Sequence, residues 1–152
     1  MQIKNRNAFT MIELIYVIVI IGVLSAIALP KFTETAVVAN DARARSEITT
    51  VMSAVATERQ RRILKGDFTH PITSLGTGGY AFSTFNADAD SNTNDVVAFY
   101  IDNCGTGDTG CWSRSGTSYI YTFVDSGSAS FKLANNKLVC DNDATDCNRL
   151  LK

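Results

Sequence analysis

The chain is 152 residues long, which leaves room for one folded domain and one membrane-length segment. Its formal net charge is −1, so the composition does not indicate a nucleic-acid partner. With a single histidine and no glycine-rich phosphate loop before a helix, the sequence supports no Ser-His-Asp, Cys-His or paired-carboxylate arrangement. We therefore expect that the protein is not an enzyme.

The apolar run from Phe9 to Pro30 organises the rest of the chain. Its single charged residue is Glu13. At about 1.5 Å of rise per residue, the run makes roughly 30 Å of helix, about the thickness of a bilayer core. A carboxylate within such a run costs about 2.5–3.5 kcal/mol near the bilayer centre and less near its edge. Glu13 therefore needs a partner.

A short polar segment, residues 1–8, precedes this run and carries Lys4 and Arg6. In a secretory signal the small-residue cleavage site follows the apolar core. Here the small residue Ala8 comes before it, so a cut between Ala8 and Phe9 would keep the hydrophobic helix in the mature protein. The order of basic leader, small residue, Phe-Thr-Met-Ile-Glu-Leu, apolar helix and proline resembles the type IV pilin superfamily, which comprises pilins and secretion pseudopilins.

The resemblance implies roles for individual residues. Ala8, where the family usually has glycine, corresponds to the residue before the prepilin-peptidase cut, and Phe9 to the N-methylated first residue of the mature chain. Glu13 corresponds to the glutamate at the fifth mature position, which pairs with a neighbour's N-terminus during assembly. Pro30 corresponds to a proline that loosens the helix, and Gly22 also weakens the helix locally. We favour the simpler interpretation that these residues only kink the helix.

The resemblance further implies partners and a location. The partners are other filament subunits, the prepilin peptidase, an inner-membrane assembly platform and, before assembly, membrane lipid. The chain would cross the inner membrane once, with its C-terminal part outside the cytoplasm, and then join a periplasmic or cell-surface filament. The filament would be a type IV pilus or a type II secretion pseudopilus.

After the apolar run, residues 31–65 continue as an amphipathic helix. Apolar residues there recur at steps of three and four, which is typical of one buried helical face. Gly66 is a natural helix stop, so we predict one helix from Phe9 to Lys65. This stretch has more basic than acidic residues, whereas residues 66–152 have more acidic ones.

Residues 66–152 are predicted to form a small head of short strands. The strand candidates are β-rich runs and alternating runs, and Asn135-Asn136 is a good two-residue hairpin turn. Packed on the second half of the helix, four or five antiparallel strands make an α+β fold. The candidate strands are Tyr80–Phe85, Val96–Ile101, Ser118–Val124, Ser130–Ala134 and Lys137–Cys140.

Four cysteines follow residue 100, at Cys104, Cys111, Cys140 and Cys147. Their even number suits disulfides in an exported domain, and neither close pair has the two-residue gap of a zinc ribbon. Sequence permits three pairings. We favour the two local loops, Cys104 with Cys111 and Cys140 with Cys147, over crossed bridges.

An acidic loop provides the one candidate metal site. Asp88, Asp90, Asn92 and Asp95 place oxygen ligands at nearly alternate positions, as a calcium loop does. The loop lacks the glycine and the bidentate glutamate of an EF-hand, and Asp and Asn are also plain turn residues. We expect no required cofactor and keep calcium as a candidate ligand.

Basic residues gather where the long helix ends, at Arg59, Arg61, Arg62 and Lys65. They could contact an acidic partner, but their position also suits the negative end of a helix dipole beside an acidic head. We favour this structural interpretation. His70, next to Pro71, is expected to be an exposed loop residue rather than a ligand.

Two other functions stay open at this point. One is a membrane-tethered binding module that never polymerises and binds calcium or a glycan through its acidic head. Glu13 argues against it, because a solitary anchor has no use for a carboxylate there. The other is a secreted protein whose signal is cut near Ala28.

Overall fold

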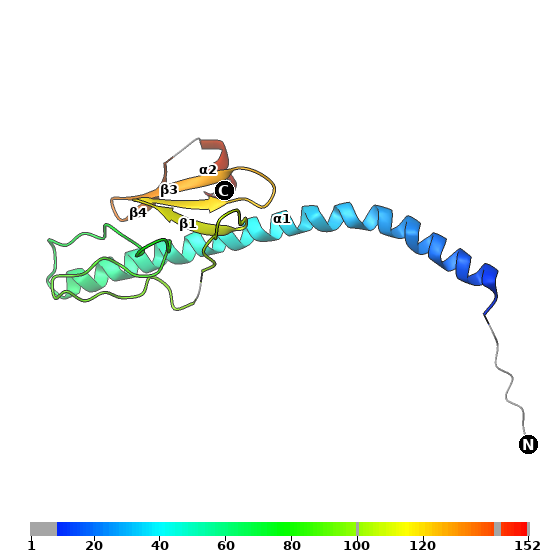
Figure 1. Ribbon diagram of the computed structural model, residues 1–152. Coiled ribbons are helices and arrows are strands. Elements are labelled where there is room, and N and C mark those ends of the chain that lie inside the picture. The colour runs from blue at the N-terminus through cyan, green and yellow to red at the C-terminus, as the bar shows by residue number, and fades with distance from the viewer. Residues whose placement is uncertain (1–8, 100, 142–143, 152) are drawn as a thin grey trace, which may run out of the picture. The chain divides into compact units, whose positions relative to one another are not determined.

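The computed structural model describes residues 9–99, 101–141 and 144–151. It divides the chain into two compact units, residues 1–36 and residues 37–152, which are described separately here. The elements are helix α1 (Met11–Leu64), strands β1 (Cys111–Ser115), β2 (Ser118–Thr122), β3 (Ser128–Ala134) and β4 (Lys137–Cys140), and helix α2 (Ala144–Leu151) (Figure 1). The fold class is α+β, as the sequence predicts.

Helix α1 has the bounds expected from its end signals. Thr10 precedes it, and the Thr10 hydroxyl accepts a hydrogen bond from the Glu13 amide at 3.3 Å, as an N-cap residue does. At the other end, Gly66 has a φ of +81°, and the amide of Asp67 donates to the carbonyl of Arg62 at 2.9 Å. This is a Schellman stop, which glycine forms without steric cost. The predicted helix from Phe9 to Lys65 is confirmed to within two residues at each end.

Within the unit 1–36, every described residue is exposed. Helix α1 runs through both Gly22 and Pro30. The hydroxyls of Ser25 and Thr33 donate to backbone carbonyls of the preceding turn, at 2.7 Å each. These polar side chains are thereby satisfied within the helix, so the run from Phe9 to Leu29 presents a mostly apolar surface.

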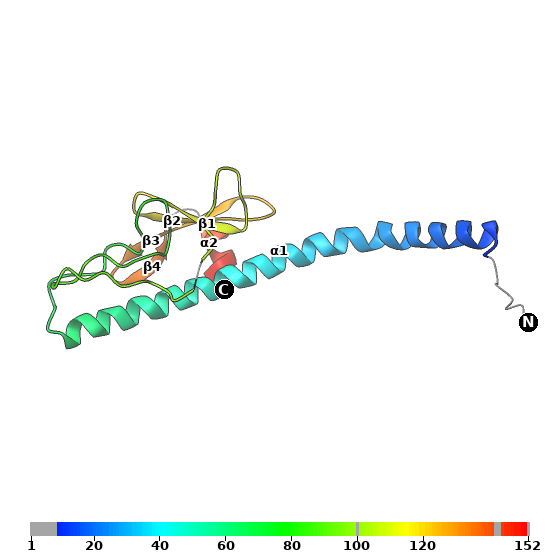
Figure 2. The ribbon, with the colours of Figure 1, turned by 60° about the horizontal axis from the view of Figure 1, so that its bottom comes forward.

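The unit 37–152 contains a four-stranded antiparallel sheet with the order β1-β2-β3-β4. Strands β3 and β4 are joined at Asn135 and Asn136, whose φ values of 51° and 58° fit a two-residue type I′ turn, and the predicted hairpin is confirmed. Figures 1 and 2 show the sheet beside the C-terminal half of α1.

The core lies between that half of α1 and the sheet. From α1 it takes small and β-branched residues that recur every three or four positions, and from the sheet mainly aromatic side chains. Trp112 is central, with its ring centroid 5.0 Å from that of Phe82 and 5.1 Å from that of Tyr121. Its buried members include Ala44, Ile48, Val51, Val55, Phe82, Phe85, Trp112, Tyr119, Tyr121, Phe123 and Phe131.

Two strand predictions are wrong. Tyr80–Phe85 and Val96–Ile101 form no strand among the described residues, and their pairing is limited to an isolated bridge between Thr84 and Asp95. Phe82, Phe85 and Val96 are instead buried individually in the core. β-Propensity largely measures the fit of a side chain to a half-buried surface, and these irregular segments meet the same requirement without a ladder.

Two elements were not predicted. Strand β1 (Cys111–Ser115) has a mostly polar sequence and pairs along its whole length with β2. Helix α2 (Ala144–Leu151) has eight residues, too short for a helix that is stable in isolation. Both depend on tertiary partners, which a local sequence pattern does not reveal.

Candidate functional site

The first candidate site is the exposed apolar segment at the start of α1. Among the described residues, α1 is the single helix that is long and apolar enough to cross a membrane, judged by length and composition. Glu13 lies in its first turn, four residues after Phe9, which is 78% exposed. Ala8, Lys4 and Arg6 lie outside the described residues.

Glu13 has a local role that the sequence motif alone did not suggest. With Thr10 at the N-cap, Glu13 occupies the third helical position, so Thr-Met-Ile-Glu has the spacing of a capping box. A carboxylate here is also favoured by the positive end of the helix dipole. This role accounts for an acidic residue in the first turn, but it does not offset the cost of its charge in an apolar core.

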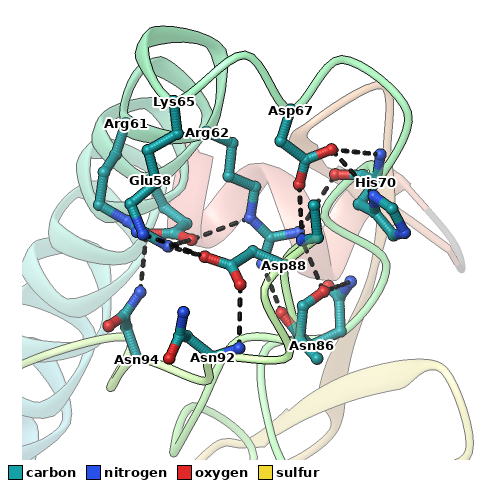
Figure 3. Close-up of polar contacts among 12 residues, drawn as sticks. Glu58, Arg61, Arg62, Lys65, Asp67, His70, Asn86, Asp88, Asn92 and Asn94 are labelled. Atoms are coloured by element: carbon teal, nitrogen blue, oxygen red, sulfur yellow. Dashed lines mark hydrogen bonds and ion pairs between the residues drawn. The ribbon is translucent and has the colours of Figure 1, made fainter.

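The second site is a polar cluster where α1 ends, shown in Figure 3. Arg62 is fully buried there, and its guanidinium donates to Glu58 at 2.9 Å and to the carbonyl of His70 at 3.1 Å. It also donates to the carbonyls of Asn86 and Ala87. One side chain thus fastens the helix to two separate segments of irregular chain.

Glu58 is the common acceptor of this cluster. Arg61 donates two hydrogen bonds to it, each of 2.7 Å, and the side-chain amide of Asn94 donates a third at 3.3 Å. The hydrogen bonds from Arg61 hold the pKa of Glu58 below its ordinary value, against the effect of burial. The buried charges are therefore paired and hydrogen-bonded, as burial requires.

Asp88 is the residue of the acidic loop that the structure buries. Its carboxylate accepts hydrogen bonds from the backbone amides of Asp90 and Asn92, at 3.1 and 2.9 Å. It also forms ion pairs with Arg61 at 3.0 Å and Lys65 at 3.6 Å. The hydrogen bond from the backbone amide of Asn92 lowers the pKa of Asp88, and burial raises it. The hydrogen bond from Arg61 lowers it further, so the pKa lies below its ordinary value. The favoured structural interpretation of the basic cluster is therefore supported.

The candidate calcium ligands are dispersed by this arrangement. Asp90 and Asp95 are exposed, whereas Asp88 faces the cations of α1. In the described part of the chain, no three His, Cys, Asp or Glu side chains are grouped so that they could hold a metal ion. Calcium binding stays a prediction from the sequence.

His70 is exposed, as expected, but it has a partner. Its ring Nδ1 lies 2.9 Å from a carboxylate oxygen of Asp67, and its amide donates to the same oxygen at 3.0 Å. Burial would raise the pKa of Asp67, but the hydrogen bonds from His70 and from the amide of Ala89 outweigh it and lower the pKa to about 2.

These shifts predict that acid weakens the unit 37–152. Asp67, Asp88 and Glu58 all have pKa values below those of the unfolded chain. The stabilisation by Asp67 is complete above its unfolded value of 3.8 and is lost as the pH falls towards about 2. As the pH is lowered from 3.8 to about 2, the urea concentration at the midpoint of unfolding, followed by the fluorescence of Trp112, should decrease. In Asp67→Asn the fall should be shallower, and an unchanged slope would contradict this assignment.

A second buried carboxylate links α1 to the sheet. Glu47 accepts the indole N–H of Trp112 at 2.8 Å and the guanidinium of Arg43 at 2.9 Å. Sequence reasoning missed that Glu47, Glu58 and Arg62 are buried. The signal was present, because all three continue the steps of three and four that mark the buried face of α1.

The cysteines pair as the sequence favoured. Cys104 is joined to Cys111 and Cys140 to Cys147, with Cα–Cα distances of 5.2 and 6.0 Å, within the span of a disulfide. No free cysteine is found among the described residues.

An open groove of about 820 Å³ lies between α1 and the segment 95–99. One wall is a row of small hydroxyl residues of α1, where Thr49, Thr50 and Thr57 donate to carbonyls four residues back. We assign no function to this groove.

The geometry defines an α+β protein whose N-terminal helix is apolar and exposed and whose polar clusters are internally paired. Residues 3–29 match the family model described as the prokaryotic N-terminal methylation motif. This motif is the prepilin signal of type IV pilins and pseudopilins, so the resemblance seen in the sequence is confirmed. Together with the long apolar helix, it supports a type IV pilin-like subunit. No solved structure matches the chain.

Proposed function

We propose that the chain is a structural subunit of a type IV pilus or a type II secretion pseudopilus. The observation that carries the proposal is the methylation motif over residues 3–29, at the start of a helix that is apolar and exposed along its first half. Proteins with this motif are in general processed by a prepilin peptidase and self-assemble. They are structural subunits rather than enzymes.

In the proposed pathway the precursor is inserted in the inner membrane, with residues 37–152 outside the cytoplasm. The peptidase cuts between Ala8 and Phe9, and Phe9 is N-methylated. An assembly platform then moves the apolar helix from lipid into a filament. The exposed side chains of this helix favour such a transfer, because in the filament they pack against equivalent helices.

Glu13 would pair with the N-terminal amine of Phe9 on a neighbouring subunit. Each group alone is costly in an apolar environment, and pairing offsets both costs at once. The pair also fixes the relative position of two helices that otherwise present uniform apolar surfaces, since a displaced register would leave both charges unpaired.

The test is the N-terminus of the mature protein. Mass spectrometry of the chain from membranes or filaments should find methylated Phe9, because the apolar helix must survive processing. Ala8→Leu should accumulate uncut precursor, since a bulky residue does not fit a site for small ones. Ala8→Gly is the matched control and should be cut at least as well.

Other N-termini lead to other functions. Leu29 at the N-terminus would identify a secreted protein that has lost its apolar segment. An intact Met1 in the membrane fraction would contradict processing and would support a tethered binding module.

A further inference from the structure

The first turns of α1 within the unit 37–152 have no buried side chain. Residues 37–43 are exposed or half-buried, and Ala44 is the first residue of the helix that the core encloses. Apolar burial therefore contributes little to holding this stretch on the sheet, and polar contacts must contribute more.

Besides the hydroxyl of Tyr121 in β2, which donates to the carbonyl of Asn40 at 3.2 Å, two sets of polar contacts reach this stretch. One set comes from α2. The Arg149 guanidinium donates to Asp41 at 2.6 Å and to Asp125 at 2.9 Å, and it lies 4.1 Å from the centroid of the Phe123 ring. In return, Arg45 donates to the backbone carbonyl of Arg149 at 2.9 Å. Helix α2 is thus tied to α1 through both the side chain and the backbone of one residue.

The position of α2 is in turn set by a disulfide. With eight residues, α2 is too short to persist alone. Cys147, 1% exposed, joins it to Cys140 at the end of β4, and Leu150, 3% exposed, packs into the core. The disulfide therefore holds Arg149 within reach of Asp41.

A second set of contacts comes from the other disulfide loop. Asp102 accepts a hydrogen bond from Arg43 at 2.7 Å. Two residues later, Cys104 is joined to Cys111, and the amide of Trp112 donates to the carbonyl of Asp102 at 3.0 Å. Arg149 and Asp102, each two residues outside a disulfide loop, thus contact the same turn of α1, at Asp41 and at Arg43.

We propose that the two disulfides control a redox-sensitive clasp, made by Arg149 and Asp102, on residues 40–43 of α1. With both disulfides closed, this stretch is held to the sheet. Reduction of Cys140–Cys147 releases α2 and with it Arg149, so the stretch opens while the buried helix beyond it stays folded. The proposal concerns the unit 37–152 by itself and does not depend on assembly.

The two ion pairs of the clasp, Arg149 with Asp41 and Arg43 with Asp102, differ in strength. The side chains of Arg149 and Asp41 are 26% and 14% exposed, whereas those of Arg43 and Asp102 are 48% and 53% exposed. Solvent screens the second pair more, so it contributes less. The loop of Cys140 and Cys147 should therefore dominate.

The chemical step is ordinary thiol–disulfide exchange. A dithiol reductant such as dithiothreitol attacks one sulfur through its thiolate. The chain gains two electrons and two protons and ends with two thiols, while the reagent closes to its cyclic disulfide. A protein dithiol could supply the same electrons.

Hydrogen exchange of the full-length chain in detergent tests the clasp. The double variant Cys140→Ser with Cys147→Ser should raise amide exchange in peptide 37–47 about tenfold, because a charge-assisted contact is lost. Peptide 48–62 should stay within about twofold. Dithiothreitol on the wild-type chain should have at least this effect, because it opens both disulfides. The variant Cys104→Ser with Cys111→Ser should have a smaller one.

Arg149→Gln keeps the test decisive if the cysteine variant does not fold. It should reproduce most of the effect in peptide 37–47 with both disulfides closed. Combined with the loss of Cys140–Cys147 it should add less than about twofold, since both changes remove the same contact. Lys132→Gln, which removes a surface ion pair with Asp141 away from α1, is the matched control.

Two results would overturn the proposal. One is an unchanged exchange rate in peptide 37–47 of Arg149→Gln. The other is an equal rise in both peptides on reduction, which would mean that the disulfides stabilise the whole unit rather than this stretch.

Discussion

The Glu13→Val chain is expected to reach the membrane and to be cut normally but to form no filaments. Valine removes the single charge of the apolar segment, so insertion into the bilayer becomes easier. In the proposed filament core, the same change would leave the Phe9 amine of a neighbour without its partner. An uncompensated buried charge typically costs about 3–5 kcal/mol, which is large against the stability of most assemblies.

Filaments are counted in cells that make the variant as their sole subunit, and precursor and mature protein are measured in the same cells. Glu34→Val is the matched control, because it removes a carboxylate from the same helix outside the apolar run. It should assemble as the wild type does. Normal filament numbers from the Glu13→Val chain would contradict the pairing.

Glu13→Gln separates the pairing from the capping role that the structure reveals. Glutamine is also preferred in a capping box, so it preserves the helix start at Thr10. It carries no charge, so it cannot neutralise the amine of Phe9. Failure of both variants is expected if the charge pair directs assembly, whereas rescue by glutamine would assign Glu13 to capping alone.

The second large effect is expected from Arg62→Met. Methionine has an unbranched apolar side chain of similar length, but it leaves the carbonyls of His70, Asn86 and Ala87 without their donor. It also removes one cation from the buried Glu58. Breaking a buried pair on one side typically costs about 3–5 kcal/mol, and unpaired buried carbonyls add to this.

Urea denaturation of the full-length chain in detergent, followed by Trp112 fluorescence, measures this loss. Arg59→Met is the matched control on the same helix, because the Nη1 atom of Arg59 has no hydrogen-bond partner among the described residues. It should change the free energy of unfolding by less than about 1 kcal/mol. Equal losses in the two variants would show that the network of Arg62 contributes nothing specific.

The acid sensitivity and the expected effect of Arg62→Met both concern how the irregular residues 66–110 are held on α1. Residues 66–110 form no strand among those described, yet they cover the end of α1 and supply the aromatic residues Phe82 and Phe85 to the core. Without a ladder of backbone hydrogen bonds, this chain is held by side chains that reach its carbonyls and amides. Arg62, Asp67 and Asp88 perform that task, which explains why charged residues are buried there.

The sequence by itself determined the elements whose signals are local. The apolar run with Glu13, the methylation motif, the helix stop at Gly66 and the turn at Asn135-Asn136 each depend on a few adjacent residues or on one periodicity. The α+β class, the antiparallel pairing and the local cysteine pairs follow from the same kind of information. Each was predicted without any contact between distant residues.

The tertiary structure decided what depends on distant partners. It left Val96–Ile101 outside the sheet, formed β1 from a polar sequence, and brought Arg149 against Asp41 across most of the domain. It also buried Glu47, Glu58 and Arg62 on a face where periodicity indicated burial but their charge argued against it. A charged residue is tolerated in a core when partners satisfy it there, and those partners come together when the chain folds.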